Sequence, residues 1–212
     1  SIVYPNLTYK KFINLIKFQT NILKIKKGSS VLDFGSGNGA FLNYYINKYQ
    51  LKNNFSLEVS KPLIFLQKKY IKNTSYYKVH YKKNNLINDF SSKKVDYSYC
   101  NSVFQYFLNE KYAAEVIEFL LYITNKNILI YDIKNFNKKR ANNEKVRKRQ
   151  KLTKMNFKEK YKNTPIRFYK KEIFRNILKK LKKKYSFDYY FKNLPKDATD
   201  AKFGYCLIIN KT

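Results

Sequence analysis

Glycine at every second position marks the stretch of this chain that is best suited to hold a ligand. Residues 31–39 read V-L-D-F-G-S-G-N-G, so an apolar segment is followed by Gly35, Gly37 and Gly39. Glycine lets the backbone adopt positive φ and lets a ligand approach the main chain without meeting a Cβ atom. The amides of such a turn, and of the first turn of a following helix, bind negative groups. We therefore expect a strand, a tight turn and a helix start here, with an anionic part of a ligand at the turn.

The position of the acidic residue before these glycines narrows the class of ligand. The chain reads D-x-G-x-G-x-G from Asp33, whereas a dinucleotide-binding turn reads G-x-G-x-x-G. The pattern resembles the first motif of the class I S-adenosylmethionine-dependent methyltransferases. By this resemblance, Asp33 orders the loop and faces the methionine amino group of the cofactor, and the pocket is lined by Gly35, Ser36, Gly37 and Gly39. The alternative is a glycine-rich turn without a ligand.

The next apolar segment supplies a candidate for the nucleoside half of the cofactor. Glu58 ends the segment 55–58, about 20 residues after the turn, where an acidic side chain meets a ribose diol in related sheets. Its two carboxylate oxygens suit two adjacent hydroxyls, and Val59 is assigned to the same site. Alone, an acidic residue at a strand end is commonly a surface residue. By the resemblance, a polar residue after the third strand contacts the adenine amino group, and Asn84 and Asn85 are at that position.

A second resemblance lies in the run N-S-V-F-Q-Y-F at 101–107. It is similar to the corresponding segment of small-molecule methyltransferases, including methyltransferase domains built into peptide-assembly enzymes. Its place after a strand borders the crevice in which open α/β sheets bind their ligands. Its phenylalanines, Phe104 and Phe107, are expected in the core. Its polar members are assigned to the cleft: Asn101, Ser102, Gln105 and Tyr106.

Two absences in the same region count against a base-flipping enzyme. Enzymes that methylate exocyclic base amines usually carry N-P-P-[YF] here, and this run has no proline. Cytosine C5 enzymes need a cysteine in a Pro-Cys turn, whereas Cys100 lies inside the predicted strand.

Three side chains are candidates for a general base. Asp132 is the carboxylate at the end of the apolar segment 127–133, and it suits either a base or a group that orients the acceptor. A cap on the following loop is an equal alternative. Tyr106 and His80 are the other two, although His80 is interpreted first as a core or rim residue of a strand at 76–81.

Composition limits the classes of partner. The net charge of +31 points to polyanions such as nucleic acid, but nearly all of it is lysine, and A/T-rich codons would produce the same bias. Arginine, which phosphate contacts favour, is scarce. The sequence has no apolar run of membrane-spanning length and no signal-peptide core, so we expect a soluble cytoplasmic protein without a membrane partner. Cys100 and Cys206 are expected as buried thiols, and one histidine leaves no metal site.

Periodicity places these candidates on elements. Helices are expected at 8–26, 40–49, 61–72, 113–124 and 170–183. Strands are expected at 30–34, 55–58, 76–81, 95–99, 127–133, 185–191 and 203–210. Helix 8–26, closed by Gly28, lies in an N-terminal segment 1–29, and helix 61–72 has helical spacing at Leu63, Leu66 and Tyr70. A basic helical insertion at 138–163 suits a mobile lid over an acidic substrate, or a solvated face.

Together these features predict an α/β, Rossmann-like class I methyltransferase fold in a single domain, 1–212. Its sheet is expected to be seven-stranded and mostly parallel, with a C-terminal antiparallel strand and helices on both faces. The resemblance implies methyl transfer from S-adenosylmethionine to an oxygen or nitrogen of a small polar metabolite, sugar or carrier-bound intermediate. The partner would then be a small-molecule or glycan substrate, possibly acidic, with nucleic acid less favoured. The alternatives are an RNA methyltransferase and a catalytically silent cofactor-binding module that acts through a partner protein.

Overall fold

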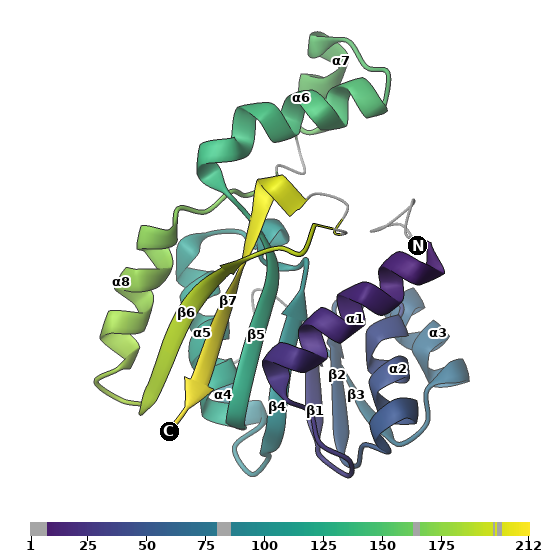
Figure 1. The fold of residues 1–212 in the computed structure, drawn as a ribbon, viewed down its shortest axis with the longest axis vertical. Helices are drawn as coiled ribbons and strands as arrows, with labels where there is room; N and C mark the ends of the chain where they lie inside the picture. The colour runs from purple at the N-terminus through teal and green to yellow at the C-terminus, as the bar shows by residue number, and fades with distance from the viewer. Residues whose placement is uncertain (1–7, 80–85, 163–165, 197, 199–200) are drawn as a thin grey trace.

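The computed structural model describes residues 8–79, 86–162, 166–196, 198 and 201–212, which are built around one sheet (Figure 1). Its strands are β1 (Val31–Phe34), β2 (Asn54–Glu58), β3 (Thr74–Lys78), β4 (Val95–Asn101), β5 (Thr124–Lys134), β6 (Phe187–Asn193) and β7 (Gly204–Lys211). The order is β3-β2-β1-β4-β5-β7-β6, and β7 is antiparallel to β5 and β6. The pairs among β1 to β5 are parallel. The predicted fold class is therefore confirmed.

Helices cover both faces of this sheet. The helices of the described residues are α1 (Tyr9–Leu23), α2 (Ala40–Tyr49), α3 (Lys61–Tyr70), α4 (Leu86–Asp89), α5 (Glu110–Ile123), α6 (Lys139–Arg149), α7 (Lys154–Lys160) and α8 (Lys171–Leu181). Short 3₁₀ turns are η1 (Phe104–Tyr106), η2 (Phe136–Lys138) and η3 (Ala201–Phe203). One apolar cluster joins α1 and α2 to the sheet, and the other joins α4, α5 and α8 to its opposite face.

The central strands are apolar on both faces because both faces are covered. In β5, Ile128 and Ile130 point into the cluster with α5, whereas Leu129 points into the cluster with α1. All three are fully buried, and each such side chain contributes about 1.5 to 3 kcal/mol by leaving water. The predicted amphipathic face of α8 is confirmed, with Phe174 and Leu178 buried against the same core as α5.

The end of α1 differs from the prediction. The helix ends at Leu23, not near Gly28, because Lys24 adopts a left-handed conformation (φ 57°) and its N–H donates to the Thr20 carbonyl. A left-handed residue after the last helical turn ends a helix by satisfying its free carbonyls. Gly28, with φ 76°, belongs to the following turn that leads into β1.

The buried side of α3 differs from the one predicted by the spacing of Leu63, Leu66 and Tyr70. Leu66 and Tyr70 are exposed, and the fully buried side chain of this helix is the polar Gln67. Gln67 forms hydrogen bonds with Ser36, the Gly37 carbonyl and Ser56 beneath the glycine turn. The buried side of α3 is therefore the side that makes these bonds, not the side predicted from its apolar residues.

The basic insertion is two helices and not one. A left-handed residue, Lys151 (φ 54°), separates α6 from α7, and the Thr153 hydroxyl caps α7 by accepting from the N–H of Asn156 at 3.1 Å. In Figure 1 the pair projects beyond the ends of the strands. That it acts as a lid stays a prediction.

Some strands begin at other residues than predicted, and the described residues allow three further observations. β3 begins two residues earlier than predicted, and β6 begins two residues later. Cys100 and Cys206 are buried and free, as predicted. None of the helices in the described part of the chain is both long and apolar enough to cross a membrane. The described residues contain no group of three or more His, Cys, Asp or Glu side chains that could hold a metal ion.

Candidate functional site

The glycine turn lies at the carboxyl end of β1, between the neighbouring ends of β2 and β4. The N–H groups of Gly35 and Ser36 donate to the Leu57 carbonyl at 2.7 and 3.2 Å, which ties the turn to β2. A Cβ atom on Gly35 would lie 2.3 Å from a methyl of Val103, which follows β4. Glycine at this position therefore allows close approach of the segment after β4.

The three glycines have different roles. A Cβ atom on Gly39 would lie 2.3 Å from Ile71 Cδ1 and 2.9 Å from Gln67 Cγ, so this glycine allows α3 to pack on the turn. A Cβ atom on Gly37 would have no atom of any described residue within 4 Å. Two glycines thus serve packing, and Gly37 is the one that faces open space.

A buried polar network supports the turn from below. Gln67 Nε2 donates to Ser36 Oγ at 2.8 Å and to the Gly37 carbonyl at 2.7 Å. The Ser56 hydroxyl donates to Gln67 Oε1 at 2.5 Å and lies 2.6 Å from Ser36 Oγ. Sequence reasoning missed Gln67 and Ser56. A glutamine inside an otherwise apolar and basic helix was the available signal, since buried amides require partners.

Glu58 points toward the glycine turn. Its Oε2 accepts from the N–H of Gly37 at 2.7 Å, and its Oε1 accepts from the N–H groups of Val59 and Ser60 at 2.9 and 3.0 Å. The residue is 7% exposed. A carboxylate has about four acceptor positions, so three amides leave capacity for a further donor. The carboxylate therefore shapes the turn, and its contact with a ribose stays a prediction.

Asp33 is the most unusual group of the site. Its side chain is 2% exposed, and Oδ2 accepts from the Tyr99 hydroxyl at 2.7 Å. Among the described residues, Oδ1 has no hydrogen-bond partner. The pKa of this carboxyl is raised to about 8, chiefly by burial, while the Tyr99 hydrogen bond lowers it and the nearby Glu58 contributes to the rise. A cationic ligand group would supply the missing donor and favour the ionised form.

Aromatic and polar side chains that sequence reasoning missed surround Asp33. Tyr99 comes from β4, and its ring packs edge to face against Tyr45 of α2 at 5.3 Å. The Tyr45 hydroxyl donates to Gln19 Oε1 of α1 at 2.6 Å. The Gln19 amide nitrogen is buried without a partner among the described residues. The sequence spacing of Tyr99, Tyr45 and Gln19 did not indicate these contacts, because they depend on the order of the strands.

The ends of β4 and β5 bring together Ser102, Asp132 and Lys134. The Ser102 hydroxyl donates to Asp132 Oδ2 at 2.7 Å, and Lys134 Nζ lies 3.0 and 3.3 Å from the two carboxylate oxygens. All three residues are buried. Ser102 and Asp132 have φ of 58° and 60°, and the β5–β7 register shifts at this point. The candidate base is thus an ion-paired carboxylate at a bulge, and its catalytic role stays a prediction.

The remaining members of the second motif separate into core and surface. Phe104 and Phe107 are buried, as predicted. Asn101 is partly buried at the end of β4, and Gln105 is buried, with Oε1 lacking a partner among the described residues. Tyr106 is 54% exposed and is available only to a ligand above this surface. Three further predicted residues, His80, Asn84 and Asn85, lie outside the described residues.

Comparison with known proteins finds one matching family model. A family model described as methionine biosynthesis protein MetW matches residues 17–208. A comparison with curated protein sequences finds no significant match.

Several solved structures share the fold. The plantazolicin methyltransferase BpumL, in complex with a triazolic desmethylPZN analogue and S-adenosylhomocysteine (SAH), is 17% identical over 98% of this chain and 86% of its own, with a TM-score of 0.70. Magnesium protoporphyrin IX methyltransferase from Synechocystis PCC 6803, with bound S-adenosylmethionine, is 12% identical over 96% and 81%, with a TM-score of 0.61. The small RNA methyltransferase HEN1 is 16% identical over 97% of this chain, with a TM-score of 0.64, but the chain spans only 26% of its length.

Replacement of Gly39 by alanine should destabilise the protein more than the same change at Gly28. Both glycines have φ near 75°, so both variants carry strain of about 1 to 2 kcal/mol. Only the Gly39 methyl would also collide with Ile71 and Gln67, whereas no described residue lies within 4 Å at Gly28. Such overpacking adds about 1 to 3 kcal/mol. Urea denaturation measures both, and equal losses would contradict tight packing of α3 on the turn.

The Asp33→Asn variant should lose part of the pH dependence of stability. The pKa of Asp33 is raised from 3.8 to about 8 in the folded protein, so between these values the folded state holds a proton that the unfolded chain has released. The stability of the protonated carboxyl is therefore fully present below pH 3.8 and is lost as pH rises through about 8. Urea denaturation at several pH values should show the wild-type free energy of unfolding falling relative to that of the variant. A difference that stays constant or rises would refute the assignment.

Proposed function

Because the chain belongs to the family described as methionine biosynthesis protein MetW, and shares its fold with methyltransferases, we propose that it binds S-adenosylmethionine. We propose further that it transfers the methyl group to an oxygen or nitrogen of a small polar metabolite, sugar or carrier-bound intermediate. The observation that carries this proposal is the buried Asp33 carboxyl beside the glycine turn, since one of its oxygens has no donor among the described residues.

The donors and acceptors of the site fit the two halves of this cofactor. The methionine half carries an ammonium group, which would satisfy Asp33 Oδ1, and Gly37 leaves the space that its backbone needs. On the neighbouring strand, Glu58 retains acceptor capacity for ribose hydroxyls, with Val59 next to it. Asn101 at the end of β4 borders the same crevice.

The protein itself has little chemistry to perform. When bound, S-adenosylmethionine supplies an electrophilic methyl group on a good leaving group. The contribution of this chain is to orient the acceptor and to exclude water. We assign the orienting role to Asp132, whose carboxylate is held by Ser102 and Lys134, and a proton-accepting role to the same group if the acceptor is a hydroxyl or an ammonium.

A catalytically silent module is the second candidate, and one observation favours it. Asp132 is buried and is held by Ser102 and Lys134, an arrangement that also suits a purely structural ion pair. RNA methylation is a third candidate, favoured by the net charge of +31 and by the aromatic share of 18%, because aromatic side chains can stack on bases.

Cofactor binding can be tested with two variants and a matched control. Gly37→Val should abolish SAH binding, because the side chain fills the open space at the turn. Glu58→Ala should weaken it by about 1 to 3 kcal/mol, because the ribose hydroxyls lose their carboxylate acceptor. Gly28→Val imposes similar backbone strain away from the site and should bind like the wild type. Isothermal titration calorimetry with SAH measures all three, and unchanged affinity in the first two would remove the assignment.

Methyl transfer itself is tested by incubating the protein with S-adenosylmethionine labelled in the methyl group and a fractionated cell extract. Label in small molecules or glycans is the expected result. Label in RNA, together with RNA binding that weakens steeply with salt, would replace our proposal by RNA methylation. Intact SAH binding without label in any fraction would support the silent module.

A further inference from the structure

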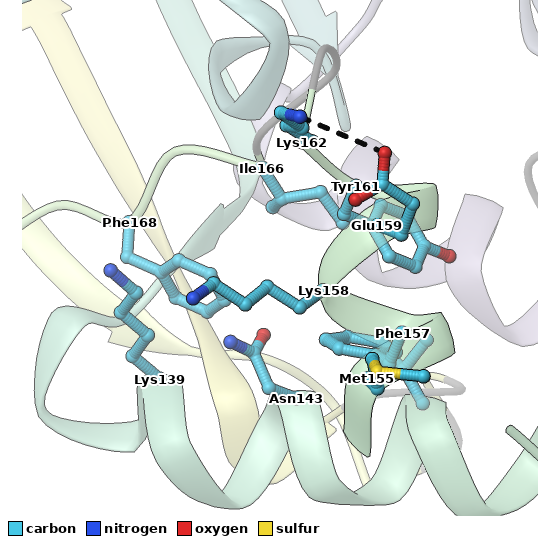
Figure 2. A pocket seen from close by; sticks show the side chains of 11 residues that line it. Lys139, Asn143, Met155, Phe157, Lys158, Glu159, Tyr161, Lys162, Ile166 and Phe168 are labelled. Carbon is cyan, nitrogen blue, oxygen red and sulfur yellow. Dashed lines mark ion pairs between the residues drawn. The ribbon is translucent and has the colours of Figure 1, made fainter. Parts of the chain in front are cut away.

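A pocket lies between α6, α7 and the segment 166–168, away from the glycine turn (Figure 2). Its volume is about 680 Å³, and small-molecule sites commonly have about 300 to 1,000 Å³. None of the residues that line it belongs to the glycine-turn site. It is therefore a separate candidate for ligand binding, in the part of the chain predicted as a basic insertion.

The walls of this pocket are apolar. Val146 comes from α6, Phe157 from α7, and Ile166 and Phe168 from the segment that precedes α8. Phe168 is buried, whereas Met155 at the rim is 78% exposed. An exposed methionine adapts its shape to different apolar ligands at little conformational cost. The pocket thus suits a chain or ring of carbon atoms.

Positive charge is concentrated on one side of these walls. Lys139 and Lys158 both line the pocket, and in Figure 2 their amino ends point toward the same end of it, beside the ring of Phe168. Neither forms an ion pair with a described residue, whereas the acidic lining residue, Glu159, pairs with Lys162 at 3.8 Å. Two lysines on the same side of an apolar pocket, neither of them paired with a described carboxylate, suit an anionic group. Such a group can accept a charge-assisted hydrogen bond from each ammonium.

The wall that carries Phe168 is fixed to the sheet. The N–H of Arg167 donates to the Gln105 carbonyl at 2.9 Å, and the N–H of Tyr169 donates to the Lys134 carbonyl at 2.8 Å. The Tyr169 hydroxyl donates to the Phe104 carbonyl at 2.9 Å. These bonds join the pocket to the ends of β4 and β5, so at least one of its walls is already formed before a ligand binds.

We infer that this pocket binds a small amphiphilic anion, with the apolar part between α6 and α7 and a carboxylate or phosphate between Lys139 and Lys158. A neutral apolar molecule would leave the two ammonium groups without a partner. An inorganic anion would leave the apolar walls in water. The inference goes beyond the proposed function and does not depend on methyl transfer.

Titration of the full chain with three twelve-carbon probes tests this inference. Dodecanoate and dodecyl phosphate, used below their micelle concentrations, carry the two headgroups, and dodecanol is the neutral reference. At least one anion should bind at a single saturable site, about tenfold or more tightly than dodecanol. The anion that binds more tightly identifies the headgroup.

Charge variants then locate the site. The double change Lys139→Gln and Lys158→Gln should weaken binding of that anion by about tenfold and leave dodecanol binding unchanged. The control, Lys179→Gln with Lys180→Gln, removes the same charge from exposed positions of α8 and should bind like the wild type. Phe157→Ser should weaken binding of all three probes because it removes an apolar wall.

Three results would overturn the inference: absence of saturable binding by both anions, equal affinity for dodecanol, or equal losses in the two double variants. SAH titration of the Lys139 and Lys158 double variant separates this test from the proposed function. Its SAH affinity should equal that of the wild type, whatever the result with the probes.

Discussion

The site depends on how closely its neighbours approach the glycine turn. Val103 lies against Gly35 from the side of β4, and α3 lies against Gly39 from the side of β2, at distances that exclude a Cβ atom. Gln67, held between these packed elements, bonds to the turn from below. The turn is therefore shaped by contacts on both flanks, and a ligand would meet a preformed surface on which Gly37 alone faces open space. Preorganisation of this kind reduces the entropy that binding must overcome.

The two carboxyl groups beside the turn differ in their hydrogen-bond donors. Glu58 accepts from three amides, so its charge is well solvated by the protein. Asp33 has one hydroxyl donor, an oxygen without a partner among the described residues, and a pKa raised by burial. Burial disfavours the ionised form of Asp33 and so favours the neutral acid, whereas a cation beside Oδ1 would favour ionisation. This asymmetry assigns the two groups to different parts of a ligand.

Backbone strain in the site lies at the ends of β4 and β5. Ser102 and Asp132 are both left-handed without being glycine, a conformation that is uncommon for such residues and concentrates at functional positions. The buried Lys134 balances the Asp132 charge and holds this bulge. Its backbone carbonyl accepts from Tyr169, so the same short stretch of β5 supports the segment that closes the α6–α7 pocket. The candidate base and the proposed α6–α7 site thus share one structural support.

The sequence by itself determined the seven strands, the helices that cover the sheet other than the short α4, and the glycine turn, because apolar periodicity and glycine spacing are local signals. It also placed Asp33, Glu58 and Asp132 at strand ends. Only the tertiary structure decided what these groups contact. Tyr99 reaches Asp33 because β4 lies beside β1, and Gln67 reaches the turn because of the rotation of α3 about its axis. No local pattern encodes either, and the apolar spacing of α3 predicted a different buried side. Lys134 likewise neutralises Asp132 only because a bulge brings the two side chains together, and the α6–α7 pocket exists only because a left-handed Lys151 divides a basic segment that reads as one helix.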